Sequence, residues 1–365
     1  LNFALVPKDR GPSELYVFFT TMKNATRQVA AAAPARHVPN ELLLKVKPGT
    51  NIDALARLLG AKVIGRMDKY GVYRLQFTDA DAADAALSQL QNNSDVQAVD
   101  YNYYFDPPPA PQTISPGSAT AAPLSLQLSP PPPSGKVIVG LIDTSVNVQS
   151  LGSDAAQFIL PQINVADGTS SDSGPTHGTA MTPLILQAIQ NSTGSGSTSV
   201  QIQPVDVYGS SETATSWNVA LGVQAAVNAG ATVLNMSLGS TGDSAVLDNV
   251  VAQAAHDGIT MFAAAGNTPI DAPYYPAADP GVIPVTALGQ PGQIASYANV
   301  WADPSMIALP GTGAFYYDGQ EWVVQGTSTS TALSSGIYAG NLAAHGWTQQ
   351  QILNAMDVKF PVPKQ

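Results

Sequence analysis

The sequence predicts an α/β protein in which a doubly wound, mostly parallel sheet follows a small α+β domain of ferredoxin-like topology. Three observations support this fold class. Continuous apolar runs, of the kind that fill a parallel sheet covered on both faces, recur along residues 135–365. Stretches with apolar residues at helical spacing separate those runs. A Pro-rich segment divides this region from a shorter one whose patterns predict the order strand, helix, strand, strand, helix, strand.

The small domain is expected at residues 41–106, after an N-terminal extension at 1–40 to which the patterns assign no structure. Its first helix is predicted between the potential cap Asn51 and the terminal Gly60. Its second helix is Ala-rich and carries Asp in its first turn, where the helix dipole favours a negative charge. The second helix is placed at 81–93, and the strands at 41–49 with a turn, 61–67, 71–77 and 96–105.

A linker is expected at residues 107–134, because "DPPPAP" and "PPPP" are typical of extended spacers. The larger domain, residues 135–365, begins with the apolar run "KVIVGLID". Further runs are "ATVLNMSL", "ITMFAAAG" and "GVIPVTAL", and helices between them are predicted to end at Gly230 and Gly258. In such sheets, ligands bind beyond the carboxyl ends of the strands.

Composition excludes several classes of function. The formal net charge is −11 and the pI is about 4.6, so the electrostatic field of the protein repels nucleic acid. Cysteine is absent, which excludes disulfides, zinc–thiolate sites and a cysteine nucleophile. No run of 18 or more apolar residues occurs, so no membrane span is expected, and "LNFALVPKDRGPS" lacks the apolar core of a signal peptide.

Several polar residues are predicted to meet at one edge of the sheet. Asp143 closes the first apolar run, Asn267 follows the third, and His177 opens a predicted helix, "HGTAMTPLILQAI". Ser328 lies in "QGTSTST", just before another predicted helix, where a serine taken alone is a helix cap. With a base and a carboxylate nearby, the same serine becomes a candidate nucleophile, because an imidazole can take its proton while the carboxylate fixes the imidazole tautomer.

The motifs "LIDTSV", "HGTAM", "LNMSLGS", "AAAGN" and "GTSTSTA" resemble, in this order, the motif set of subtilisin-like serine proteases over about residues 135–345. The resemblance implies Ser328 as nucleophile, His177 as general base and then acid, and Asp143 as the carboxylate that orients the imidazole. It implies Asn267 as the amide donor to the oxyanion. The small domain resembles the inhibitory propeptide of the same family, which also acts as an intramolecular chaperone.

The family order also selects between two serines, because "Gly-Thr" directly precedes Ser328, so that Ser330 is expected to be a small packing residue. The resemblance further implies a peptide cleft lined by Ser237, Leu238 and Gly239 and by the segment around Gly209, where backbone groups can pair with an extended substrate. Tyr274 aligns with a position that is very small in many members, at the base of the primary specificity pocket. A preference for small or medium residues before the cleaved bond is therefore expected.

The chain departs from the family pattern in places. Thr329 and Ser330 stand where Met and Ala are usual after the nucleophile, and Ala180 and Met181 replace the usual His-Val pair. The chemistry requires no cofactor. The loop "QNSTGSGSTSV" contains no carboxylate, so the calcium site that many relatives build there is expected to be missing, while other calcium sites remain unknown.

These residues predict a serine endopeptidase in proenzyme form that cleaves polypeptides and is kept latent by its own N-terminal domain. A secreted or periplasmic location is expected from family habit. The first alternative is a catalytically silent subtilase-fold binding or scaffold module, against which the intact Ser, His and Asp argue. A second is a sedolisin-like protease, which shares Gly-Thr-Ser but uses Glu and Asp partners; "HGT" at a helix start favours His177 instead.

Overall fold

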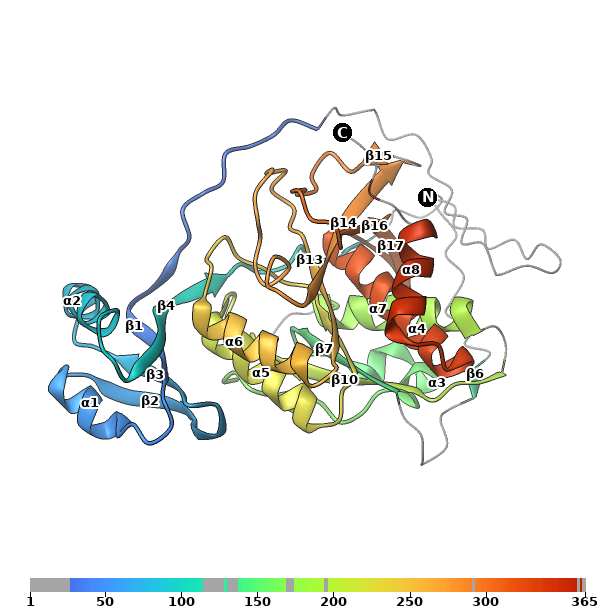
Figure 1. The fold of residues 1–365 in the computed structure, drawn as a ribbon. Helices are drawn as coiled ribbons and strands as arrows, with labels where there is room; N and C mark the ends of the chain where they lie inside the picture. Colours follow the sequence, from blue (N-terminus) through green and yellow to red (C-terminus); the bar gives the residue numbers. More distant parts are fainter. Residues whose placement is uncertain are drawn as a thin grey trace.

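The computed structural model describes residues 27–113, 128–129, 137–168, 174–193, 196–290, 293–359 and 362. Figure 1 shows a small domain, coloured blue to teal, beside a larger one built around a twisted sheet. The helices α5 (Ser216–Asn228) and α6 (Ala245–His256) lie on the side of the large sheet that faces the small domain. The prediction of a small α+β domain before a doubly wound α/β domain is confirmed.

The small domain has the predicted strand–helix order, and its sheet runs β4-β1-β3-β2, which is the ferredoxin-like arrangement. All its strand pairs are antiparallel. The first strand begins at His37, four residues before the strand expected at residue 41. The elements are β1 (His37–Val46), α1 (Ile52–Leu58), β2 (Lys62–Met67), the short 3-10 helix η1 (Asp68–Tyr70), β3 (Val72–Gln76), α2 (Ala80–Leu90) and β4 (Val96–Phe105).

Local signals place the two helices of this domain. Asn51 Oδ1 accepts a hydrogen bond from the Ala54 N–H at 3.0 Å, as expected of a helix cap, and Gly60 follows the helix with a φ of 70°. Asp79 caps α2 through the Ala82 N–H at 2.8 Å. Both helices cover one face of the sheet over a core that includes Leu42, Leu44, Leu75 and Leu90.

The sheet of the large domain has the order β15-β14-β13-β12-β7-β10-β8, with β16 paired to β14. All of its pairs are parallel except β14–β15. The chain starts at β7 and adds β10 and β8 on one side before it adds β12, β13 and β14 on the other, so a topological switch point lies at β7. The strands are β7 (Val137–Asp143), β8 (Ile163–Asn164), β10 (Val200–Asp206), β12 (Val233–Met236), β13 (Thr260–Ala264), β14 (Val282–Gln290), β15 (Gln293–Ile294) and β16 (Ile307–Pro310).

Helices cover both faces of this sheet. The face opposite α5 and α6 is covered by α4 (His177–Thr193) and α7 (Thr327–His345), whose apolar residues share one core with β7, β10 and β13. The remaining short elements are η2 (Val148–Leu151), α3 (Ser153–Ala156), β9 (Gly196–Ser197), β11 (Ala214–Thr215), β17 (Thr312–Tyr317), β18 (Gln320–Gln325) and α8 (Gln349–Lys359).

Part of the Pro-rich region pairs with the large domain. The strand β5 (Gln112–Thr113) pairs antiparallel with Trp322 and Val323 of β18, and β6 (Leu128–Ser129) pairs parallel with β9. Leu128 is buried in the core of the large domain. Residues 114–127 and 130–134 of the expected linker lie outside the described residues. Across the part of the chain that the structure covers, no helix is long and apolar enough to span a membrane.

The segment before β1 is anchored on the large domain by one arginine. The Arg27 guanidinium donates to the carbonyls of Ala298 and Ile270 at 2.8 and 3.0 Å and pairs with the Asp271 carboxylate at 2.6 Å. Its side chain is only 13% exposed. In Figure 1 this segment runs from β1 around the outside of the larger domain.

Candidate active site

Asp143 and His177 form a buried pair at the carboxyl edge of the large sheet. Asp143 is the last residue of β7, and His177 is the first residue of α4. The His177 Nδ1 atom lies 2.9 and 3.0 Å from the two Asp143 carboxylate oxygens. The Thr144 N–H also donates to Asp143 Oδ1 at 2.7 Å, which fixes the carboxylate. This arrangement holds the imidazole in the tautomer that leaves Nε2 free to accept a proton.

The packing of α7 against α4 determines where Ser328 lies. A Cβ atom placed on Gly336 of α7 would lie 2.5 Å from the Ile185 carbonyl oxygen of α4, and one placed on Gly340 would lie 3.1 Å from the Ile189 carbonyl. The two glycines therefore let the helix backbones approach closely. Both contacts join residues 151 positions apart, and Ser328 is also 151 residues after His177. The two helices start at the same edge of the sheet. This register therefore places Ser328 of α7 at the same height along the helix pair as His177 of α4.

Ser328 is the second residue of α7 and is only 3% exposed. Its Oγ atom donates to the Ser237 carbonyl at 3.2 Å, and Ser237 Oγ donates to the Ser328 carbonyl at the same distance. The buried His177 Nε2 atom has no hydrogen-bond partner among the described residues. A catalytic hydrogen bond is often absent or long until substrate binds.

Asn267, in the loop after β13, lies against the first residue of the same helix. Its Oδ1 atom accepts hydrogen bonds from the Thr327 N–H at 2.9 Å and from Thr327 Oγ1 at 3.2 Å. Because a backbone N–H can only donate, the atom facing it is the amide oxygen, and the Asn267 NH₂ group must point elsewhere. No bond to that NH₂ group is recorded within the described residues. It is available to a negative oxygen beside the Ser328 N–H at the N-terminus of α7.

A second buried carboxylate, which the motifs did not indicate, adjoins the pair. Asp206 ends β10 and is the register partner of Asp143 on β7. One of its oxygens accepts from the N–H groups of Tyr208 and Gly209 at 3.0 and 2.8 Å, and the other has no donor in the described part of the chain. Burial, with a smaller contribution from Asp143, raises the pKa of Asp206. The segment "IQPVD" also ends in Asp, but Gln203 and Pro204 interrupt the apolar run that marks a strand such as "VIVGLID".

The Tyr274 ring packs against the segment after β12. Ser237, Leu238 and Gly239 follow directly after β12, and the Tyr274 hydroxyl donates to the Gly239 carbonyl at 3.0 Å. A Cβ atom on Gly239 would lie 2.2 Å from this ring, and one on Gly266 would lie 2.9 Å from it. The ring thus fills the space between the residues after β12 and those after β13. Burial raises the pKa of Tyr274 to about 12, so its hydroxyl stays protonated and remains a donor.

Gly209 takes a different position from this group. Its φ is 59°, and an added Cβ would lie 2.1 Å from the Asp167 carbonyl, so the structure packs Gly209 against the loop after β8. Its neighbour Tyr208 reaches the small domain instead, since the Tyr208 hydroxyl donates to the Asp106 carbonyl at 3.1 Å. Ser330, in contrast to Ser328, points into the interior and donates to the Leu309 carbonyl at 2.9 Å.

Within the ranges that the structure describes, no group of three or more His, Asp or Glu side chains is arranged to hold a metal ion. The arrangement can instead supply a hydroxyl, an imidazole fixed by a carboxylate, and two N–H donors, which together are the groups that acyl transfer needs.

Comparison with known families agrees with this geometry. A model of the subtilase family matches residues 134–359. The chain belongs to the subtilase family. A second family model, the fervidolysin N-terminal prodomain, matches residues 23–102. The small domain of this subtilase is therefore a prodomain, as its resemblance to a propeptide predicted.

Curated relatives and solved structures are similar to this subtilase over different lengths. Thermitase from Thermoactinomyces vulgaris is 30% identical over 224 residues, which are 60% of this chain and 79% of that protein. The thermostable alkaline protease of Halalkalibacterium halodurans is 34% identical over 190 residues, which are 49% of this chain and 52% of that protein. The chain thus spans only about half the length of the latter relative.

Two solved structures share the fold. Fervidolysin from Fervidobacterium pennivorans, described as a keratinolytic enzyme related to subtilisin, has a TM-score of 0.64 and 18% identity, and the match covers 92% of this chain and 58% of that one. The epidermin leader peptide processing serine protease of Staphylococcus aureus has a TM-score of 0.61 and 15% identity, with 88% of this chain and 92% of that chain covered.

Proposed function

We propose that this subtilase is the proenzyme of a serine endopeptidase. Ser328 attacks the carbonyl carbon of a peptide bond while His177 takes its proton, and the protonated His177 then gives that proton to the leaving amine. Water hydrolyses the resulting acyl-enzyme by the same sequence of proton transfers. The observation that carries the proposal is the register of α4 and α7, which sets Ser328 level with the Asp143–His177 pair.

The Asn267 amide and the Ser328 N–H are proposed to bind the oxygen of the tetrahedral intermediate. The two hydrogen bonds from Thr327 fix the amide before substrate arrives, so its NH₂ group needs no reorganisation during the reaction. In subtilisin, loss of one such donor costs about 10²–10³ in kcat. A loss of similar size is expected here for Asn267→Ala.

The substrate is proposed to be a polypeptide with a small or medium side chain before the cleaved bond. The Tyr274 ring occupies the space between Gly239 and Gly266, where a larger side chain of the substrate would otherwise enter. Ser237 to Gly239 offer backbone groups for pairing with an extended peptide. The role of Gly209 is proposed to be indirect, because its φ of 59° shapes the turn that presents Tyr208.

The prodomain is proposed to keep the enzyme latent. Its last strand, β4, pairs antiparallel with β11, and the following residues reach β18, the strand directly before Ser328. Pro107, Pro108, Pro109 and Pro111 lie in this connecting tail. Proline has no N–H to pair with a protease cleft, so the tail is a poor substrate for the site that it adjoins. A secreted or periplasmic location is part of this proposal and follows the habit of the family.

The proposal is tested with a serine-directed phosphonylating reagent and mass spectrometry of the full chain. An adduct on Ser328 that is lost in His177→Ala supports the enzyme. Ser330→Ala is the matched control, because it removes a nearby hydroxyl that is bonded to the Leu309 carbonyl and should leave labelling intact. If the chain is never labelled, even after the tail is cut, the silent binding module is the better description.

A further inference from the structure

Four carboxyl groups meet where the prodomain docks on the catalytic domain. Asp100 comes from β4, Asp243 precedes α6, Asp248 lies in the first turn of α6, and Asp279 lies in the loop before β14. We call these four residues the aspartate cluster. The carboxyl groups of Asp243 and Asp279 both act on the carboxyl group of Asp248. Asp243 and Asp248 are the charged groups that act on Asp100 across the domain interface.

Among the described residues, few hydrogen-bond donors offset the negative charge of the aspartate cluster. Asp279 is only 3% exposed, and neither of its carboxylate oxygens receives a hydrogen bond from a donor in the described part of the chain. The buried Oδ1 atom of Asp248 also lacks a donor there. Two neighbouring buried carboxylates cannot both ionise at low cost, so Asp248 and Asp279 must share a proton. The cluster is therefore built to hold at least one proton in the docked state.

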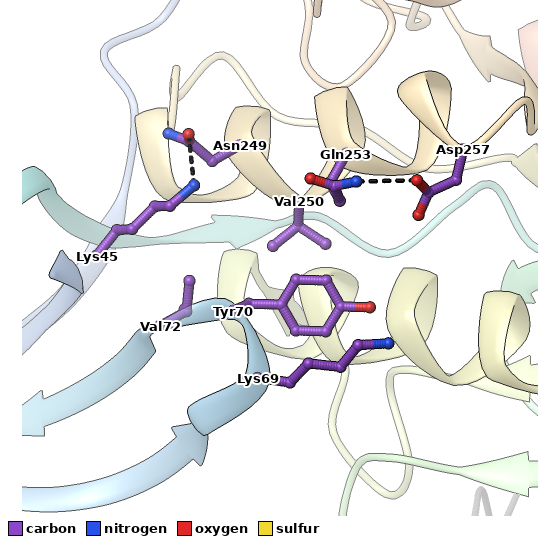
Figure 2. Close-up of a pocket in the computed structure, with 8 residues that line it drawn as sticks. All are labelled: Lys45, Lys69, Tyr70, Val72, Asn249, Val250, Gln253 and Asp257. Atoms are coloured by element: carbon purple, nitrogen blue, oxygen red, sulfur yellow. Dashed lines mark hydrogen bonds between the residues drawn. The ribbon is translucent and has the colours of Figure 1, made fainter. Parts of the chain in front are cut away.

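The other titratable groups facing the cluster are phenols and one distant ammonium. Burial raises the pKa of Tyr275 and of Tyr103 to about 12, and the carboxyls of Asp243 and Asp100, respectively, add to the shift. The Lys45 ammonium of β1 also reaches α6, but its hydrogen bond goes to Asn249 Oδ1 at 2.8 Å. Figure 2 shows this neighbouring part of the interface, a cavity of about 300 Å³ between the prodomain and α6.

When the prodomain docks, Asp100 comes close to the other carboxyls and forms a short hydrogen bond with the catalytic domain. Its Oδ2 atom accepts a hydrogen bond from the Ala245 N–H at 2.7 Å, at the N-terminus of α6. Next to it on β4, Asn102 Oδ1 accepts from the Trp217 N–H at 3.0 Å, at the N-terminus of α5. The helix ends attract the prodomain strand, while Asp243 and Asp248 repel a charged Asp100. The balance between these effects depends on how many protons the cluster holds.

We propose that the aspartate cluster is a pH-sensitive latch, which holds the prodomain on the catalytic domain while it is protonated and loosens the prodomain as it ionises. This inference rests on the proposed role of the prodomain as the inhibitor of the enzyme. It assigns the signal for activation to a rise in pH. No histidine is needed, since the titrating groups are carboxyls whose charge is disfavoured by burial and by one another.

The sign of the effect follows from proton linkage. Burial, and then the neighbouring carboxyls, raise the pKa of Asp100 from 3.8 to about 6. Burial likewise raises the pKa of Asp248 to about 6 and that of Asp279 to about 9. Undocking exposes Asp100 and separates it from Asp243 and Asp248, so the docked form binds more protons. Docking is therefore strongest below about pH 4 and weakens as pH rises through about 6, by at most about tenfold per pH unit for each linked proton.

The test measures docking in the full chain with Ser328→Ala, which prevents self-cleavage and needs no enzymatic activity. Hydrogen exchange is followed at the amides that donate to prodomain side chains, namely those of Trp217 and Ala245. Variants are compared with the parent at the same pH, so intrinsic exchange rates cancel. Between about pH 5 and about pH 8, protection in the parent should fall at least tenfold. In Asp100→Asn, whose amide oxygen can still accept from the Ala245 N–H but which cannot ionise, it should fall much less.

Two matched variants serve as controls. Asp95→Asn removes one charge from an exposed position just before β4 and should behave like the parent. Lys45→Gln weakens a contact with α6 but removes no carboxyl group, so it should lower protection by the same factor at both pH values.

Specific outcomes would overturn the latch. They are protection in the parent that does not change with pH, and a response of Asp100→Asn that matches that of Asp95→Asn. If Asp100→Asn does not fold, Asp243→Asn removes the larger charge repulsion on Asp100 from an exposed residue and should reduce the pH response. Calcium that restores protection at about pH 8 would also overturn it, because a cation rather than a proton would then neutralise the cluster. The labelling of Ser328 is a separate experiment, so failure of the enzyme and failure of the latch are distinguishable.

Discussion

Gly336 of α7 lies against the backbone of Ile185 in α4, so closely that a Cβ atom on the glycine would be 2.5 Å from the Ile185 carbonyl oxygen. This contact fixes how far apart the two helices pack and, through their common register, where Ser328 lies relative to His177. Gly336, two turns into α7, thereby affects the position of the nucleophile Ser328 at the start of that helix.

We predict that Gly336→Ala lowers kcat by about 10–100-fold with a smaller change in KM, because a displacement of about 1 Å between reacting groups is costly. Overpacking should also destabilise the fold by roughly 1–3 kcal/mol. Steady-state kinetics on a peptide substrate and thermal unfolding measure the two effects. Ser334→Ala is the control, since it removes a hydroxyl bonded within α7 itself. A variant that unfolds earlier but reacts at the normal rate would contradict the role given to this contact.

The pair Asp143–His177 could be predicted from the sequence because each residue directly adjoins a local pattern, an apolar strand or a helix start. The same holds for Asn51 as a cap and for the strand order of the prodomain, where pattern and topology agree. Asp206 was not proposed, although "IQPVD" ends like "VIVGLID", because its place beside Asp143 depends on which strands become neighbours. A single-strand pattern contains no information about that register.

The aspartate cluster was beyond prediction for a stronger reason. Its members come from β4, from both sides of the start of α6 and from the loop before β14, so only the docked tertiary structure brings them together. The short pairs formed by β5 and β6 were missed for a related reason. Each has only two residues, and the prolines around them favour an extended spacer when only local sequence is considered.

Tyr274 gives a prediction about specificity. Tyr274→Gly removes the ring that fills the space beside Gly239 and Gly266, so cleavage after Phe relative to cleavage after Ala should rise by about 10-fold or more. A peptide library that varies the residue before the cleaved bond measures the ratio. Tyr274→Phe removes only the hydrogen bond to the Gly239 carbonyl and should keep the preference of the parent. Equal cleavage after Phe and Ala by the parent enzyme would contradict the filled pocket.

The Pro-rich tail gives a prediction about processing. Replacing Pro107, Pro108 and Pro109 with Ala restores three backbone N–H groups in the segment between the docked strand β4 and β5. The variant should therefore cut its own tail faster than the parent, by roughly 10-fold or more if the missing N–H groups limit cleavage. Mass spectrometry over time locates the cut. The same substitutions combined with Ser328→Ala should give no cut, and a cut that persists there would come from another protease.

The buried pair Asp248–Asp279 gives a prediction about stability. Burial and the adjacent carboxyl of Asp248 raise the pKa of Asp279 from 3.8 to about 9 in the folded protein. In the unfolded chain this carboxyl ionises near its ordinary value, so the unfolded state loses its proton first as pH rises. The contribution of the protonated pair to stability is thus fully present below about pH 4 and is lost between about pH 4 and pH 9. The parent should unfold progressively more easily over that range.

Asp279→Asn replaces the shared proton with a permanent N–H donor of similar size, which can bond to Asp248 at any pH. We expect this variant to be more stable than the parent at about pH 8, by at least about 1 kcal/mol, which corresponds to roughly 2–4 °C in Tm. At about pH 4 the two should differ little, because the parent then holds its proton. Thermal unfolding at both pH values, each in the Ser328→Ala background, measures the difference. A variant that is destabilised equally at both would show that Asp279 holds its surroundings through contacts other than a shared proton.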